Sequence, residues 1–268
     1  GGAIAHPAVT AITQEYNKTE ICTATYQCYL PGVWSNSGNI ITARIKLSGN
    51  SSSIGAGIVA GGCAPVPVNV MYACTEEYNG STWSAGGAMI NARGLLGGFG
   101  TQDAQVAAGG STSMPTNTSD LTEEYNGSSW SSATAMITAM REIGRAGTTA
   151  HAGLVFTGGS NKTQEYDGTN WSTGGNLITG TVNPGGFGEV NAAVKVGGEA
   201  GALQTCVEHY DGSSWSAATA YPLVVCAPQG TGTQNAGVSF GGASFPSNPT
   251  EALQNTYSYN GVSWSASG

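Results

Sequence analysis

The six tryptophans of this chain recur at a nearly constant spacing of 41 to 49 residues, and this repeat limits the available folds more than any other feature. A Tyr stands five residues before each Trp, and in five of the six units Asn-Gly or Asp-Gly follows that Tyr. These dipeptides are strong hairpin signals, because both central residues of a type I′ turn need a positive φ. Each unit is therefore predicted to contain a hairpin whose first strand ends at the Tyr and whose second strand begins at the Trp. The tryptophans are Trp34, Trp83, Trp130, Trp171, Trp215 and Trp264.

A Gly-Gly pair closes a short apolar run ahead of the Tyr in the last five units, as in Ile58-Val-Ala-Gly-Gly62. Another Gly-rich stretch precedes each run, as in Leu95-Leu-Gly-Gly-Phe99. Both stretches are predicted to be strands near a crowded axis, where only small residues let backbones approach. Four strands in about 45 residues are the pattern of a β-propeller blade.

The number of Trp-containing units predicts an all-β, six-bladed propeller that forms one domain over 1–268. The expected blades are about 1–38, 39–87, 88–134, 135–175, 176–219 and 220–268. The first is degenerate and reads Tyr29-Leu-Pro-Gly-Val-Trp34. The alternative is five blades plus half-blades joined at the termini. The missing initial Met predicts processing or a fragment.

The repeat resembles a known motif. Gly-Gly after an apolar strand, then a Tyr and a Trp, looks like the Kelch repeat. The longer string from Thr122 to Trp130, followed by a segment such as Met136-Ile-Thr-Ala or Ile41-Thr-Ala-Arg, is similar to Kelch-like repeat proteins of marine bacteriophages and their hosts. The resemblance covers essentially the whole chain and implies a propeller. It also implies a virion, tail-fibre or surface structural role, although fold alone does not determine function.

The composition excludes several partners. Charged residues are 9% of the chain, against roughly 25% in an ordinary domain, and the net charge is -8. The excess of acidic residues disfavours nucleic-acid binding. No apolar run approaches the roughly 20 residues that cross a bilayer, so no membrane insertion is expected.

Three of the four arginines occupy matching places ten or eleven residues after a Trp. In a propeller this place lies near one mouth of the central channel. One interpretation is that each Arg bonds backbone carbonyls or a repeat Glu. The other is a basic ring that binds an anion or an acidic glycan. The residues are Arg44, Arg93 and Arg141.

A catalytic set is not evident. His6, His151 and His209 are scattered, and no GxSxG, HExxH or phosphate-loop motif occurs. Glu76 and Glu77 cannot form an acid/base dyad, because neighbours on a strand face opposite sides. The repeated acids predict blade-edge solvation or bonding between blades. We therefore expect no enzyme activity, no cofactor and no metal.

Six cysteines suggest disulfides in an oxidising compartment. Cys63–Cys74 would staple a ten-residue loop, Cys22–Cys28 lie within the divergent first unit, and Cys206–Cys226 pair only by elimination. The alternative is six reduced thiols.

Seven Asn-x-Ser/Thr sequons could be glycosylated, although hairpin-turn chemistry also explains some of them. They begin at Asn17, Asn50, Asn79, Asn117, Asn126, Asn161 and Asn170.

The loops between the Gly-Gly pair and the Tyr vary most in length, and variable loops on a regular scaffold often carry binding. We expect a non-enzymatic structural or adhesion propeller on a virion or in an extracellular assembly. It would contact protein neighbours or a receptor, or assemble with itself. The alternative is a lectin-like, glycan-binding module, and a glycosidase or lyase fits less well.

Overall fold

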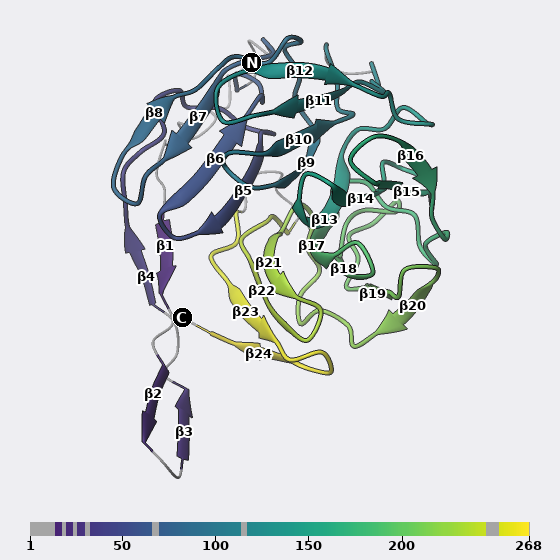
Figure 1. Cartoon of the computed structure of the whole chain (residues 1–268). Coiled ribbons are helices and arrows are strands. Elements are labelled where there is room, and N and C mark those ends of the chain that lie inside the picture. Colours follow the sequence, from purple (N-terminus) through teal and green to yellow (C-terminus); the bar gives the residue numbers. More distant parts are fainter. Residues whose placement is uncertain are drawn as a thin grey trace, which may run out of the picture.

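The computed structural model describes residues 14–17, 20–23, 26–29, 33–65, 70–113, 117–244 and 252–267, with side chains from Trp34 onward. These residues form five four-stranded antiparallel sheets and two separate two-stranded sheets. The prediction of an all-β propeller is confirmed, but the prediction of six four-stranded blades is wrong. The described residues build five blades arranged around a centre (Figure 1).

The five blades fall within the predicted ranges from residue 39 onward, and each runs from an inner to an outer strand in chain order. Blade 1 contains β5 (Ser48–Ser53), β6 (Ala56–Ala60), β7 (Thr75–Tyr78) and β8 (Trp83–Ala85). Blade 2 contains β9 (Gly97–Gly100), β10 (Gln105–Ala108), β11 (Thr122–Tyr125) and β12 (Trp130–Ala133). Blade 3 contains β13 (Ile143–Thr149), β14 (Ala152–Thr157), β15 (Thr163–Tyr166) and β16 (Trp171–Thr173). Blade 4 contains β17 (Gly185–Glu189), β18 (Ala192–Val196), β19 (Val207–Tyr210) and β20 (Trp215–Ala218), and blade 5 contains β21 (Gln229–Thr233), β22 (Ala236–Phe240), β23 (Thr256–Tyr259) and β24 (Trp264–Ala266).

The first repeat unit forms only the outer half of a blade. β1 (Gln14–Asn17) pairs with β4 (Val33–Asn36), and Tyr16 lies opposite Trp34. This register matches Tyr78 opposite Trp83 in blade 1. Tyr16 therefore occupies the blade position that the repeat spacing predicted for Tyr29. We call the β1–β4 pair the half-blade.

A second hairpin is inserted within the half-blade. β2 (Glu20–Thr23) pairs with β3 (Tyr26–Tyr29) and no other described strand, and it projects away from the ring (Figure 1). It occupies the chain between β1 and β4, where the blades have only a four-residue turn. The insertion therefore hid the match between Gln14–Asn17 and the Thr-Glu-Glu-Tyr strands of the blades.

The half-blade lies between blade 5 and blade 1. The Trp34 Nε1–H donates to Thr256 Oγ1 at 2.8 Å, and the Trp34 ring meets Phe240 edge-on at 5.1 Å. On its other side, Trp83 Nε1–H donates to the Gly38 carbonyl at 3.0 Å. The outer wall of the ring thus continues through the half-blade.

The hairpin turns after the Tyr are confirmed in the five blades, but they are not type I′. In the first unit the predicted hairpin from Tyr29 to Trp34 is wrong, because β3 pairs with β2 and β4 pairs with β1. Gly80 has a φ of +91°, whereas Asn79 is outside the positive-φ region. The Asn79 side chain instead accepts the backbone N–H groups of Ser81 and Thr82 at 3.0 and 2.9 Å. Asn at this position is favoured because its side chain imitates a backbone turn.

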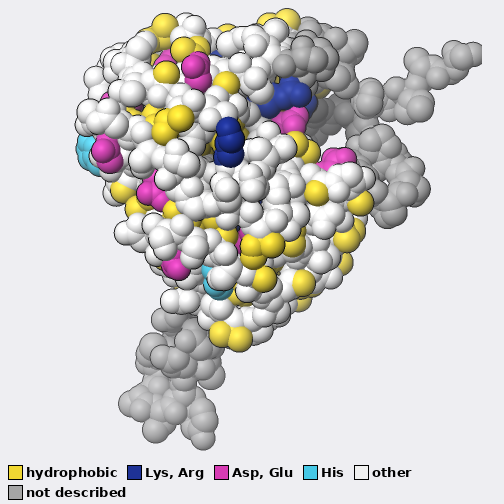
Figure 2. All heavy atoms as spheres, turned by 90° about the vertical axis from the view of Figure 1, so that its right-hand side faces the viewer, with side chains coloured by type: hydrophobic (Ala, Val, Ile, Leu, Met, Phe, Trp, Pro, Cys, Tyr) yellow, Lys and Arg dark blue, Asp and Glu magenta, His cyan; other side chains and the backbone are white. Residues whose placement is uncertain are grey.

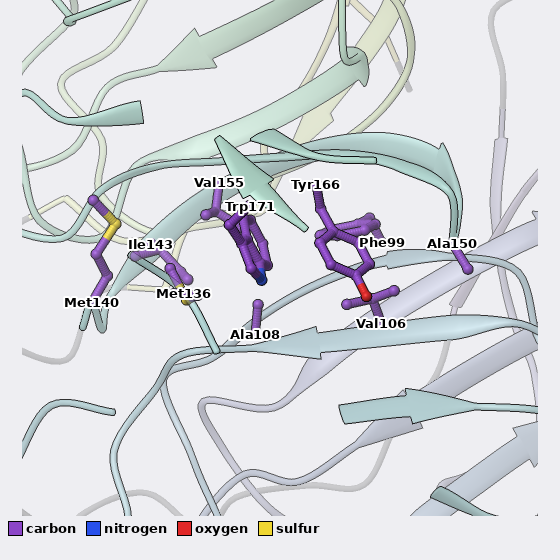
Figure 3. Packing of buried hydrophobic residues seen from close by; sticks show 10 residues of the cluster. All are labelled: Phe99, Val106, Ala108, Met136, Met140, Ile143, Ala150, Val155, Tyr166 and Trp171. Carbon is purple, nitrogen blue, oxygen red and sulfur yellow. The ribbon is translucent and has the colours of Figure 1, made fainter. Parts of the chain in front are cut away.

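Each of the four junctions between consecutive blades from 1 to 5 contains one core cluster. Between blades 2 and 3, Phe99 and Val106 from the inner strands of blade 2 meet Tyr166 and Trp171 from the outer strands of blade 3 (Figure 3). Phe99 and Val106 are fully buried. Tyr and Trp thus fill the wide outer space between blades.

Candidate functional site

The first Glu of the third strand is buried and holds the connection between blades. The Glu123 carboxylate accepts the N–H of Ile90 at 2.7 Å and the guanidinium of Arg93 at 3.1 Å. Arg93 also donates to the carbonyls of Gly109 and Leu121, both at 2.7 Å. Burial lowers the pKa of Arg93, and Glu123 acts in the opposite direction. The connection that follows β8, the last strand of blade 1, is therefore fixed by the Arg93–Glu123 ion pair at blade 2.

The same arrangement recurs in blades 1 and 4. Glu76 pairs with Arg44 and accepts the N–H of Ile41 at 2.5 Å. In blade 4 the cation is Lys195, whose Nζ lies 3.2 Å from Glu208 Oε1. Blade 3 has Gln164 in place of the Glu. The Gln164 side-chain amide accepts the backbone N–H of Thr138 and donates to the carbonyl of the same residue. The repeated acids are thus structural partners.

These clamped connections present one aliphatic side chain each to solvent. The four residues follow their Trp by seven positions and are 55–61% exposed. They lie at the end of the propeller that also carries the variable loops, because both kinds of connection leave antiparallel sheets at the same end. We call them the isoleucine set: Ile41, Ile90, Ile137 and Ile178.

The isoleucine set is a feature that sequence reasoning missed. Its signal was present, since an Ile recurs seven residues after four of the six tryptophans. Periodicity alone would have assigned these residues to the core. Buried carboxylates in three blades and the Gln164 amide in blade 3 hold the backbone at these residues, and the Ile side chains are exposed.

Two of the predicted binding arginines are enclosed within blades. Arg44 is 4% exposed and Arg93 is fully buried, so neither side chain lines an open site. They bond a repeat Glu and backbone carbonyls, which was the other interpretation of these residues. Arg141 is partly exposed and also engaged by other groups. The structure therefore does not bring the three arginines together as a basic ring.

Arg145 is the arginine that reaches the central channel, and sequence reasoning missed it. It lies on the inner strand β13, and its Nη2 donates to the Gly49 carbonyl of β5 at 2.7 Å and to Gln229 Oε1 of β21 at 3.3 Å. Burial lowers the pKa of Arg145 to about 10, so the guanidinium is still charged at pH 7. The described residues give it no carboxylate partner. It links three blades across the channel.

A sequence signal for Arg145 exists in the aligned inner strands. The other four blades all have Gly at the matching register position, which leaves room for one long side chain in the channel. The glycines are Gly49, Gly98, Gly186 and Gly230.

The Glu that directly precedes the Tyr on the third strand accepts a hydrogen bond from a Tyr of the next blade. Tyr125 donates its hydroxyl to Glu77 at 2.5 Å, and Tyr210 donates to Glu165 at 2.5 Å. Burial, assisted by these carboxylates, raises the pKa of Tyr125 and of Tyr210 to about 12. The prediction that the repeated acids bond between blades agrees with this geometry.

The other titratable groups do not converge. His209 lies against Tyr259, with Nε2 3.0 Å from the hydroxyl, and burial lowers its pKa. His151 is exposed, while His6 lies outside the described residues. Within the described part of the chain, no group of His, Cys, Asp and Glu could hold a metal ion. No described helix has the length and apolarity to cross a membrane.

The four cysteines with described side chains are free thiols, so the predicted Cys63–Cys74 and Cys206–Cys226 bridges are not formed in this structure. Cys206 Sγ instead lies 3.0 Å from Lys195 Nζ. Burial raises the pKa of Cys63 and of Cys226, which disfavours their thiolates. Cys22 and Cys28 lie on β2 and β3, but their side chains are outside the described residues.

The sequons divide into turns and loops. Asn79 and Asn126 use their side chains to hold hairpin turns. Asn117 bonds Thr112, and the buried Nδ2 of Asn50 has no described partner. Asn161 and Asn170 are exposed, and the Asn17 side chain lies outside the described residues.

Comparisons with known proteins support the fold alone. No family model and no curated protein matches the chain. Among solved structures, that of YjhT matches with a TM-score of 0.73 over 95% of this chain and 92% of the other, at 10% identity. A likeness at that identity shows that the chain is a β-propeller. It shows no relation to Kelch or phage proteins.

Proposed function

We propose that this propeller is a non-enzymatic structural or adhesion protein of a virion or extracellular surface assembly, which binds other protein chains. The observation that carries the proposal is the isoleucine set. Four exposed aliphatic side chains at equivalent positions on one end form a repeated apolar feature of the kind found at protein interfaces. The Kelch-like and phage-like character of the repeat belongs to the same proposal.

The distribution of charge supports a protein partner. Most of the visible surface is uncharged, with only scattered acidic and basic side chains (Figure 2). Three of the eight Lys and Arg residues are buried against Glu. The surface thus offers no basic patch for nucleic acid and little electrostatic steering of a charged substrate.

The aromatic side chains favour protein binding over the glycan-binding alternative. Every Trp Nε1–H donates to a group of the protein itself. Among the described residues, the exposed large hydrophobic side chains are all aliphatic. A sugar-binding platform would instead present an aromatic face, so the lectin proposal ranks second. An enzyme ranks lower still, because the repeated acids already serve as structural partners.

The proposal is tested by replacing all four residues of the isoleucine set with Thr, which keeps the β-branched shape and removes apolar surface. Sedimentation velocity and negative-stain microscopy should show assembly of the wild-type chain that depends on concentration and is lost in the variant. The matched control replaces Ile54 and Val262, which are exposed at the opposite end, with Thr. Dispersed wild-type monomers at every concentration would overturn the proposal, and hits on a glycan array would favour the alternative.

A further inference from the structure

Blade 4 brings two nucleophilic side chains into contact. The Lys195 Nζ lies 3.0 Å from the Cys206 Sγ. Lys195 belongs to β18, and Cys206 directly precedes β19, the strand that pairs with β18. The clamp between blades does not need a sulfur here, since the ammonium already has the Glu208 carboxylate as its counter-ion at 3.2 Å. The contact between amine and thiol is therefore a separate feature of this blade.

The surroundings hold the amine against the sulfur. The Lys195 side chain is fully buried, and its ammonium also donates to the Thr179 carbonyl at 3.2 Å. Glu208, Thr179 and Cys206 together occupy the three donors of the ammonium. Cys206 is partly exposed, so a small oxidant can reach this residue from solvent while the amine stays enclosed. Any group formed on the sulfur thus forms beside the amine.

Blade 1 provides a matched comparison. Cys74 directly precedes β7, as Cys206 precedes β19, and it is also partly exposed. The cation that pairs with the equivalent Glu of blade 1 is the Arg44 guanidinium. A delocalised guanidinium is not a nucleophilic primary amine. Of these two equivalent places, only the one in blade 4 combines a thiol with a lysine amine.

We propose that Lys195 and Cys206 are a redox-modified pair, which hydrogen peroxide joins through one oxygen atom into a covalent N–O–S cross-link. The first peroxide oxidises the Cys206 thiol to a sulfenic acid, so that an S–O bond forms, the peroxide O–O bond breaks and one water leaves. The Lys195 ammonium passes its extra proton to Glu208. A neutral amine then lies beside the sulfenic oxygen.

A second peroxide completes the cross-link. The amine nitrogen and the sulfenic oxygen form an N–O bond, while the nitrogen loses two electrons and the peroxide gains them. One N–H hydrogen and the sulfenic O–H hydrogen leave with the oxygen atoms of this peroxide as two waters. The complete reaction consumes two peroxides and releases three waters. It adds one oxygen to the chain and removes two hydrogens.

The test treats the folded full chain with hydrogen peroxide and follows it by mass spectrometry. The chain should gain the mass of one oxygen and lose that of two hydrogens. Digestion with thermolysin, which does not require a lysine, should yield a peptide pair linked through Lys195 and Cys206. Excess dithiothreitol should release the two peptides. The proposal is overturned if no such pair forms and Cys206 is unchanged, carries only added oxygen or is joined to another cysteine.

Three variants locate the chemistry. Lys195→Arg keeps a cation beside Glu208 but has no lysine amine, so the linked pair should disappear. Cys206→Ser keeps a hydroxyl acceptor for the ammonium and should also lose the link. Cys74→Ser, the matched control in blade 1, should leave the link unchanged. Thermal unfolding checks that each variant is folded before treatment. The same mass change in either of the first two variants, or its loss in Cys74→Ser, would contradict the assignment.

Discussion

The junction between blades 2 and 3 differs from the inner position between β21 and β5, which no described strand occupies and which we call the open sector. At the closed junction, Phe99 lies against Gly153 and forms one cluster with Tyr166 and Trp171. At the open sector, Gly57 has the same backbone position without a described ring over it. Equivalent glycines therefore differ in the size of side chain that they could accept, because the neighbouring blade determines the space at each repeat position.

The largest difference in stability between the two regions is expected when the buried Arg–Glu ion pairs are broken. Arg93→Met should destabilise the chain by about 3–5 kcal/mol, because it leaves the buried Glu123 without its counter-ion. Arg44→Met, next to the open sector, should cost about 1–2 kcal/mol less, since Arg44 has fewer acceptors and its Nε and Nη2 have no described partner. Urea unfolding of both variants measures the difference. Adding Glu123→Gln should recover part of the Arg93→Met loss, and equal costs at the two sites would contradict the comparison.

The paired glycines test the comparison directly. Gly153→Val should cost about 2–3 kcal/mol, because the new side chain must displace the buried Phe99 ring. Gly57→Val should cost less than Gly153→Val, because a Cβ at Gly57 meets its nearest described atom, the Tyr78 Cβ, at an ordinary contact distance of 3.5 Å. Thermal and urea unfolding give both values. Equal costs at the two glycines would contradict the comparison.

Arg145 holds together the two blades that flank the open sector. Arg145→Met should lower stability by about 1–2 kcal/mol, because it removes charge-assisted bonds to Gly49 and Gln229 while keeping a long side chain in the channel. The measurement is urea unfolding, with hydrogen exchange at Lys46 as a local readout. A loss confined to blade 3, with no change near β5 or β21, would contradict this role.

The smallest effect is expected from the tyrosines and depends on pH. Tyr titrates near pH 10 when unfolded, and the pKa of Tyr125 and of Tyr210 is raised to about 12. The folded chain keeps these protons more tightly, so their contribution is complete below about pH 10 and is lost as the pH rises towards 12. The unfolding temperature should therefore fall over that range. Tyr125→Phe should cost about 1 kcal/mol at pH 7 and make the fall shallower, while a pH-independent unfolding temperature would contradict the assignment.

Much of the fold could be predicted from the sequence because the repeat is local. The Tyr and Trp fix where two strands of each blade end and begin, and the Gly-Gly pairs mark the end of the inner hairpin. The blade count could not be obtained in this way. The insertion between Asn17 and Val33 moved Trp34 away from Tyr16, and a count of tryptophans treats a half-blade as a whole one.

The candidate site was less predictable, for a physical reason. Arg44 and Arg93 occupy matching places in the repeat and are enclosed beside carboxylates, whereas Arg145 lies on an inner strand and bonds two other blades. The difference depends on which strand positions become neighbours around the ring. Ile90 likewise appears apolar and core-like until Glu123, more than thirty residues away, fixes its backbone outward.

The sequence by itself determined the strand pattern, the hairpin turns and the packing of each blade, because these arise from contacts within about 45 residues. Only the tertiary structure decided that the described residues form five four-stranded blades and one two-stranded half-blade. The half-blade is recognised by the pairing of β1 with β4 across an inserted hairpin, and no local repeat carries that information.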